Sequence, residues 1–118
     1  PSTDTGWYDG EHSSWFNSST NPQAPVLFSR YNVSSPPKPV LWYGEIIAAA
    51  TDGSNTVWRF AHNHNGGLVG SYTGQSFAQI SNDGRWALFS SPWDGTLGGA
   101  AGDFDYPTRM DTFVVELK

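Results

Sequence analysis

The stretch ISNDGRWALFSSPWDG, from Ile80 to Gly95, decides the fold. An Asp-Gly turn at Asp83-Gly84 precedes the apolar run Trp86–Phe89, and a second Asp-Gly turn follows at Asp94-Gly95. Asp and Gly are favoured in the tight turns that connect antiparallel strands. The stretch therefore predicts a short β-strand between two turns, and the Asp83 carboxylate is expected to bond the backbone of its own turn.

The rest of the chain repeats this pattern of short strands and turns. No window keeps the apolar spacing of an amphipathic helix, so the sequence predicts no helix beyond single turns. The expected strands are rich in β-branched and aromatic residues and are bounded by Gly, Pro, Asn or Asp. They are Val26–Tyr31, Glu45–Ala50, Thr56–His62, Ser76–Ile80, Arg85–Ser90 and Thr112–Leu117, with a further aromatic strand at Ser14–Ser18. The predicted fold class is all-β.

Two pairs of these segments resemble each other. VLFSRY at Val26–Tyr31 is similar to ALFSSP at Ala87–Pro92, and EIIAAA at Glu45–Ala50 is similar to TFVVEL at Thr112–Leu117. A repeated unit of a few strands is typical of β-propeller blades. Residues 1–118 are interpreted as a single unit of about two four-stranded antiparallel blades, approximately 7–62 and 75–118, joined by 63–74. A β-sandwich with an accidental repeat is the alternative.

The segment Ile80–Leu117 also resembles the repeat of TolB-type, WD40-like β-propellers. That repeat has a Ser-x-Asp-Gly-Lys/Arg turn, an apolar strand that ends in Ser, an Asp-Gly loop and a strand of the type Asp-Ile-Tyr-Val-Val-Asp-Leu. The matching residues here are Ser81, Asp83, Gly84, Arg85, Leu88, Phe89, Ser90, Asp94, Gly95, Asp111, Phe113, Val114, Val115 and Leu117. In such a blade, Trp86–Phe89 is expected to be buried on both faces.

Propellers close with about four to eight blades, whereas this chain supplies about two. We therefore expect further blades, either from a longer parent protein or from copies of this chain. The strand Thr112–Leu117 is expected to pair with a strand from elsewhere, since an exposed edge recruits other strands.

Composition narrows the function. The net charge of −5 offers no basic surface for nucleic acid, and no apolar run is long enough to span a membrane. Cysteine is absent, which excludes disulfides and thiol catalysis. The chain has no initiator Met or basic-apolar leader, and its Gly, Trp, Ser and Asn content suits an exported protein, so we expect a processed product or a piece, located outside the cell or in the periplasm. Asn17 and Asn32 begin glycosylation acceptor patterns.

The densest polar segment is FAHNHNGG followed by YTGQSF. It resembles the region of oligogalacturonate lyases and their propeller relatives in which a His-Asn segment, a Gln and a His-x-His pair hold a divalent metal. Gln75 matches that Gln, and His62 or His64 matches the first His. The His-x-His positions hold Ala78 and Ile80, so no transition metal and no metal cofactor is expected here.

The ligand-binding candidates are the polar and aromatic side chains of this crossing and of the second Asp-Gly turn. They are His62, His64, Tyr72, Gln75 and Trp93. The two histidines are expected to face the same side and to bond neighbouring backbone. The carboxylates of Asp94, Asp103 and Asp105 are calcium candidates on a Gly-rich loop.

No catalytic residue emerges from the sequence, so the favoured interpretation is a non-catalytic segment of an exported β-propeller protein with a scaffold or glycan- or protein-binding role. The alternatives are part of a lyase-like propeller enzyme that acts on acidic polysaccharide, and a stand-alone carbohydrate-binding β-sandwich module.

Overall fold

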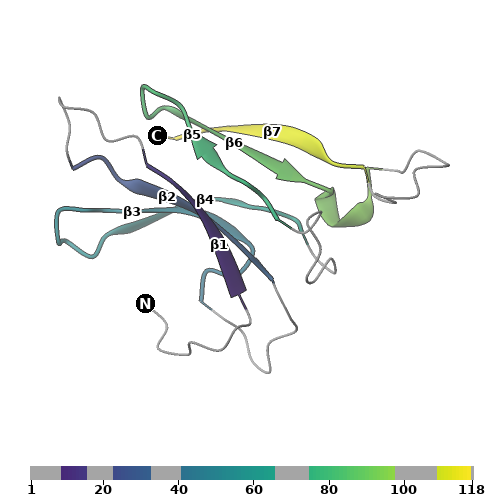
Figure 1. Cartoon of the computed structure of the whole chain (residues 1–118), viewed down its shortest axis with the longest axis horizontal. Coiled ribbons are helices and arrows are strands. Elements are labelled where there is room, and N and C mark those ends of the chain that lie inside the picture. The colour runs from purple at the N-terminus through teal and green to yellow at the C-terminus, as the bar shows by residue number, and fades with distance from the viewer. Residues whose placement is uncertain (1–8, 16–22, 33–40, 66–74, 98–108, 118) are drawn as a thin grey trace.

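The computed structural model describes residues 9–15, 23–32, 41–65, 75–97 and 109–117. These residues form two antiparallel sheets, and none of them lies in an α-helix, which confirms the all-β prediction. Sheet 1 has the order β1 (Asp9–Ser14), β2 (Val26–Asn32), β3 (Glu45–Ala49), β4 (Val57–His62). Sheet 2 has the order β5 (Gln79–Ile80), β6 (Trp86–Ser91), β7 (Asp111–Glu116). Figure 1 shows the sheets as two layers, with the 3-10 turn η2 (Trp93–Gly95) after β6.

Five of the strands expected from the sequence lie where the turn signals placed them, namely β2, β3, β4, β6 and β7. The strand expected at Ser76–Ile80 is shorter, because only Gln79–Ile80 keeps ladder geometry. The aromatic strand expected at Ser14–Ser18 is not seen in that place: β1 ends at Ser14, and residues 16–18 lie outside the described part.

The core lies between the two sheets. Its buried members are Leu27, Ile46 and Ala48 from sheet 1, and Ala78, Ala87 and Phe89 from β6 and the segment that enters β5. Burying a Leu, Ile or Phe side chain contributes roughly 1.5–3 kcal/mol. This contact therefore holds the sheets together.

Burial in β6 alternates along the strand. Ala87 and Phe89 face sheet 1 and are buried, whereas the side chains of Trp86 and Leu88 are 39% and 42% exposed. The expectation that Trp86–Phe89 is buried on both faces is therefore wrong, because within the described ranges only one face of sheet 2 is covered. The continuous burial expected there occurs instead in β3, at Ile46–Ala48.

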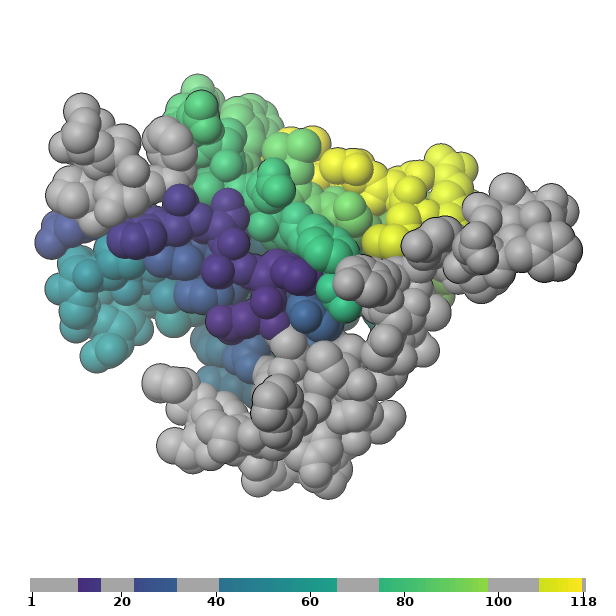
Figure 2. Space-filling model, in the orientation of Figure 1, coloured from purple at the N-terminus to yellow at the C-terminus, as the bar shows by residue number. Residues whose placement is uncertain are grey.

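Serine hydroxyls join the two sheets where β1 lies beside the segment that enters β5 (Figure 2). The Ala78 amide donates to Ser29 Oγ at 3.1 Å, and the Ile80 amide donates to Ser14 Oγ at 3.1 Å. Buried backbone amides need an acceptor. The two hydroxyls therefore take the place of a neighbouring strand.

The Asp83 turn is built as the sequence predicted. Ser81 Oγ donates to Asp83 Oδ1 at 2.6 Å, and the Arg85 amide donates to the same oxygen at 3.1 Å. These hydrogen bonds, the one from Ser81 first, lower the pKa of Asp83. Asp83 thus has a structural role.

Within the part of the chain that is described, no helix has the length and apolar character needed to cross a membrane.

Candidate functional site

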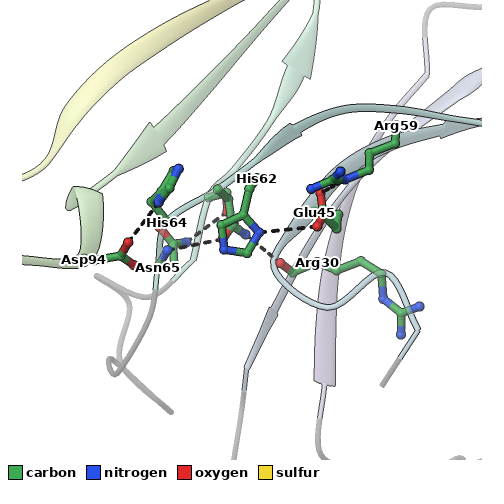
Figure 3. A network of polar contacts seen from close by, with 9 residues as sticks. Arg30, Glu45, Arg59, His62, His64, Asn65 and Asp94 are labelled. Atoms are coloured by element: carbon green, nitrogen blue, oxygen red, sulfur yellow. Dashed lines mark hydrogen bonds and ion pairs between the residues drawn. The ribbon is translucent and has the colours of Figure 1, made fainter. Parts of the chain in front are cut away.

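One polar cluster lies where the end of β4 approaches η2 (Figure 3). We call it the histidine cluster, and its members are Glu45, Arg59, His62, His64, Trp93 and Asp94. It joins residues that are far apart in sequence, because the antiparallel β3–β4 pair brings Glu45 opposite His62. The cluster therefore depends on the fold.

Its first half lies on sheet 1. Arg59 Nε donates to Glu45 Oε2 at 2.6 Å, and His62 Nδ1 lies 3.3 Å from Glu45 Oε1. The hydrogen bond and charge of Glu45 raise the pKa of Arg59. Since the Glu45 side chain is only 13% exposed, these two partners supply the polar contacts that its burial requires.

A glycine makes room for His62. Gly44 has φ +67°, and a Cβ at this position would lie 2.8 Å from His62 Cε1. The backbone of Gly44 also accepts a hydrogen bond from the Asn63 amide at 2.7 Å. Glycine therefore permits both the left-handed turn and the close approach of the imidazole.

The second half joins the segment after β4 to η2. His64 Nδ1 lies 2.8 Å from Asp94 Oδ2, and the Asp94 amide donates to the His64 carbonyl at 2.6 Å. The His64 ring stacks on Trp93 with centroids 4.2 Å apart, and meets the His62 ring edge-on at 4.9 Å. A backbone hydrogen bond, a side-chain hydrogen bond and ring stacking thus all connect His64 to the Trp93-Asp94 pair.

Three residues of this contact have left-handed backbone conformations. The φ angles are +51° at His64, +49° at Trp93 and +55° at Asp94. Such conformations cost non-glycine residues on the order of 1–3 kcal/mol each, and they gather at functional sites. The contacts between His64 and the Trp93-Asp94 pair offset part of this cost.

Asn63 supports the cluster from inside the protein. It is 1% exposed, and its Nδ2 donates to the Arg30 carbonyl and to Ser76 Oγ, both at 2.7 Å. Its Oδ1 accepts from the Asn65 amide at 3.2 Å. Asn63 therefore ties sheet 1 to the segment that enters sheet 2.

The structure gathers part of the set predicted from the sequence. His62, His64 and Trp93 meet, together with Asp94, whereas Gln75 bonds His12 Nε2 at 2.9 Å. The expectation that the histidines bond backbone is wrong for their side chains, which contact the carboxylates of Glu45 and Asp94. The remaining candidates lie outside the described residues, namely Tyr72, Asp103 and Asp105.

Sequence reasoning missed two members of the cluster, Glu45 and Arg59. Their contact follows from the β3–β4 register, in which Arg59 is opposite Ile47 and a bulge separates it from Ala61. Opposite charges on neighbouring expected strands were a usable signal, but the register was not readable from the sequence.

The histidine cluster offers imidazole, carboxylate and guanidinium groups that form hydrogen bonds with one another. Among the described residues, no group of three or more His, Asp or Glu side chains is arranged to hold a metal ion. The Trp93 ring stacks on the His64 ring, and its centroid lies 4.6 Å from the centroid of the Phe113 ring. The side chains of His62, His64 and Asp94 are 44%, 32% and 46% exposed, and Trp93 is 37% exposed, so all four are accessible to a ligand.

No protein-family model, no curated protein and no solved structure matches this chain.

Proposed function

We propose that this chain is a non-catalytic segment of an exported β-propeller protein, in which sheets 1 and 2 are successive blades that form a scaffold for binding. The observation that carries the proposal is the way in which the two sheets meet. The face of sheet 1 that packs against sheet 2 has its counterpart on the face of sheet 2 that points away from the contact.

The strand registers support an equivalence between the sheets. The sequence similarity aligns Leu27 of β2 with Leu88 of β6. Leu27 pairs with Ala48, and Leu88 pairs with Val114, so Ala48 corresponds to Val114. This register aligns Glu45 with Asp111, one residue before the Thr112 suggested by sequence similarity. Both sheets then follow one antiparallel pattern.

The faces in contact differ between the two sheets. Leu27 and Ala48 face sheet 2 and are 0% and 3% exposed, whereas their counterparts Leu88 and Val114 face away and are 42% and 58% exposed. Phe89, which aligns with Phe28, is buried against sheet 1. One face of the first repeat thus packs against the opposite face of the second.

Head-to-tail packing of repeats favours a propeller over a sandwich. In a heterologous contact, two different faces of the repeat meet, so the first and the last repeat each keep one uncovered face. Further repeats can add at these faces and produce a ring or an open stack. Propeller blades are repeated around an axis in this manner.

A stand-alone carbohydrate-binding sandwich is the second candidate. The face-to-face packing of two antiparallel sheets favours it. An outer face that exposes Trp86, Leu88 and Val114 disfavours it, unless these side chains themselves bind sugar.

The non-catalytic part of the proposal is supported by the residues at the β4–β5 crossing. The side chain at Ala78 is buried and apolar, and Ile80 packs against the core, so neither position presents an imidazole. Gln75 bonds His12 on β1. A metal-dependent lyase of the type that the sequence resembles would need these ligands together.

The test is an assay of the 118-residue chain on polygalacturonate, with and without added manganese or calcium, that follows the ultraviolet absorbance of unsaturated products. We expect no turnover and no retained metal after dialysis. A titration of acidic and neutral oligosaccharides, observed by NMR, then locates any binding. We expect binding shifts at His62, His64 and Asp94 that are lost in His64→Ala and kept in the control His12→Ala. Turnover that disappears in His64→Ala would contradict the proposal and favour the lyase.

A further inference from the structure

The two imidazoles of the histidine cluster are both held at Nδ1 by a carboxylate. His62 Nδ1 lies 3.3 Å from Glu45 Oε1, and His64 Nδ1 lies 2.8 Å from Asp94 Oδ2. An ionised carboxylate accepts hydrogen bonds and donates none, so the imidazole has to be the donor. In both neutral rings Nδ1 therefore carries the proton, and Nε2 keeps a lone pair that can accept a hydrogen bond.

These two Nε2 atoms are open to a ligand. Among the described residues, the Nε2 atom of neither ring has a hydrogen-bond partner, and both side chains are partly exposed. The His62 and His64 rings are neighbours, with centroids 4.9 Å apart. His12 differs, because its Nε2 already bonds Gln75 Oε1 at 2.9 Å. The histidine cluster thus presents two hydrogen-bond acceptors side by side.

The charges around the two rings favour a ligand without negative charge. Arg59 is paired with Glu45, and the Asp94 carboxylate adds a negative charge beside His64. The guanidinium of Arg30 points away from the imidazoles and donates to the Leu41 carbonyl (Figure 3). With neutral imidazoles the cluster is therefore anionic, and a second carboxylate placed next to Asp94 is repelled.

We propose that the histidine cluster binds the hydroxyl groups of a neutral sugar, which donate to Nε2 of His62 and of His64, and that it discriminates against uronates. The inference rests on the proposed function, because it takes the binding role assigned there and names the class of ligand. A hydroxyl group supplies the donor that each Nε2 lacks. A uronate supplies hydroxyls as well, but it brings a carboxylate toward Asp94.

The imidazole tautomers give the first test. Long-range proton–nitrogen NMR spectra of the natural chain are recorded at about pH 8, where free imidazole is neutral. We expect His62 and His64 each to show an unprotonated Nε2 and a protonated Nδ1. His12 is the internal reference, because its bond to Gln75 requires a protonated Nε2. A protonated Nε2 in His62 or in His64 would overturn the proposal.

Matched sugars give the second test. Methyl α-galactoside and methyl α-galacturonide differ only at C6, and the corresponding gluco pair varies the ring configuration. Each is titrated at about pH 8 with EDTA present, and NMR shifts are followed. We expect a neutral glycoside to shift the His62 and His64 resonances and to bind at least about fivefold more tightly than its uronide. His62→Ala should abolish these shifts, whereas the control His12→Ala should keep them.

Three results of the titrations would overturn the proposal. They are the absence of shifts with both neutral glycosides, binding of a uronide as tight as that of its neutral partner, and binding that appears only when a divalent metal is added. Circular dichroism checks that each variant keeps the fold of the natural chain.

Asp94→Asn tests the electrostatic part. Removing this charge should narrow the preference for the neutral glycoside at least about threefold. Asp52→Asn makes the same change at the opposite end of the β3–β4 pair and should leave the preference unchanged. An unchanged preference in Asp94→Asn would overturn the discrimination. Selective uronide binding without turnover overturns this inference alone, whereas polysaccharide turnover that is lost in His64→Ala overturns the proposed function.

Discussion

His64 and Asp94 hold each other twice: the His64 imidazole lies 2.8 Å from the Asp94 carboxylate, and the Asp94 amide donates to the His64 carbonyl at 2.6 Å. Both residues have positive φ. The same pair therefore carries the local strain and the contacts that offset it. It connects the end of β4 to the turn after β6, and through that turn to sheet 2.

The backbone strain at Asp94 gives the first prediction. Asp94→Gly and Asp94→Ala both remove the carboxylate, but only glycine adopts φ +55° without steric cost. We expect Asp94→Gly to be more stable than Asp94→Ala by about 1 kcal/mol in urea unfolding. At Thr112, an exposed strand position, the order should be reversed. Equal stabilities at Asp94 would show that the left-handed conformation is not required.

Gly44 and Gly53 form a matched pair for the second prediction. Both have positive φ, but a Cβ at Gly44 meets His62, whereas a Cβ at Gly53 meets nothing within 4 Å. We expect Gly44→Ala to lower the free energy of unfolding by about 1 kcal/mol or more beyond the effect of Gly53→Ala, because overpacking adds to strain. In a His62→Ala background that excess should disappear. An excess that persists there would assign the cost to some other contact.

Asn63 is the subject of the third prediction. Asn63→Ala leaves the Arg30 carbonyl without the Nδ2 donor that bonds it now, and we expect a loss of about 1–3 kcal/mol of unfolding free energy. Asn82→Ala, at an exposed turn position, should stay within about 0.5 kcal/mol of the natural chain. Similar changes in unfolding free energy for the two variants would show that Asn63 does not stabilise the contact between the sheets.

The pKa of Asp83 gives a prediction for acid pH. Hydrogen bonds, above all from Ser81, lower the pKa of this carboxyl in the folded chain. Its contribution to stability is therefore complete above 3.8, the ordinary pKa of an aspartate side chain, and is lost as pH falls through the lower folded pKa. A carbon NMR titration of the Asp83 carboxyl should have its midpoint below 3.8, and Ser81→Ala should move it upward. A midpoint at or above 3.8 in the natural chain would contradict the turn geometry.

The strands were predictable from the sequence because turn residues separate them. Asp83-Gly84 marks the β5–β6 turn, and Asp52-Gly53 precedes β4. The one-sided burial of β6 was not predictable, since alternating exposure of Trp86 and Leu88 depends on which face meets sheet 1. An apolar run has the same sequence whether one or both faces are covered.

The candidate site was predictable only in part. His62 and His64 stand out as neighbours in the sequence, but Glu45 joins them through a register that the chain reveals only when folded. The contact of Trp93 with His64 depends on left-handed backbone at both residues. Bulky side chains rarely adopt that conformation, so propensity argues against the geometry that brings them together.

The hydroxyls of Ser14 and Ser29 block the addition of a strand at one edge of sheet 2. They accept the hydrogen bonds of the Ala78 and Ile80 amides, so these two amides are not available as donors to a further strand. Among the described strands of sheet 2, β7 is the one at which another strand can join. Fibrillar stacking needs sheets that extend at both sides. Two side-chain oxygens thus close one edge of sheet 2, and a strand that extends this sheet has to join it at β7.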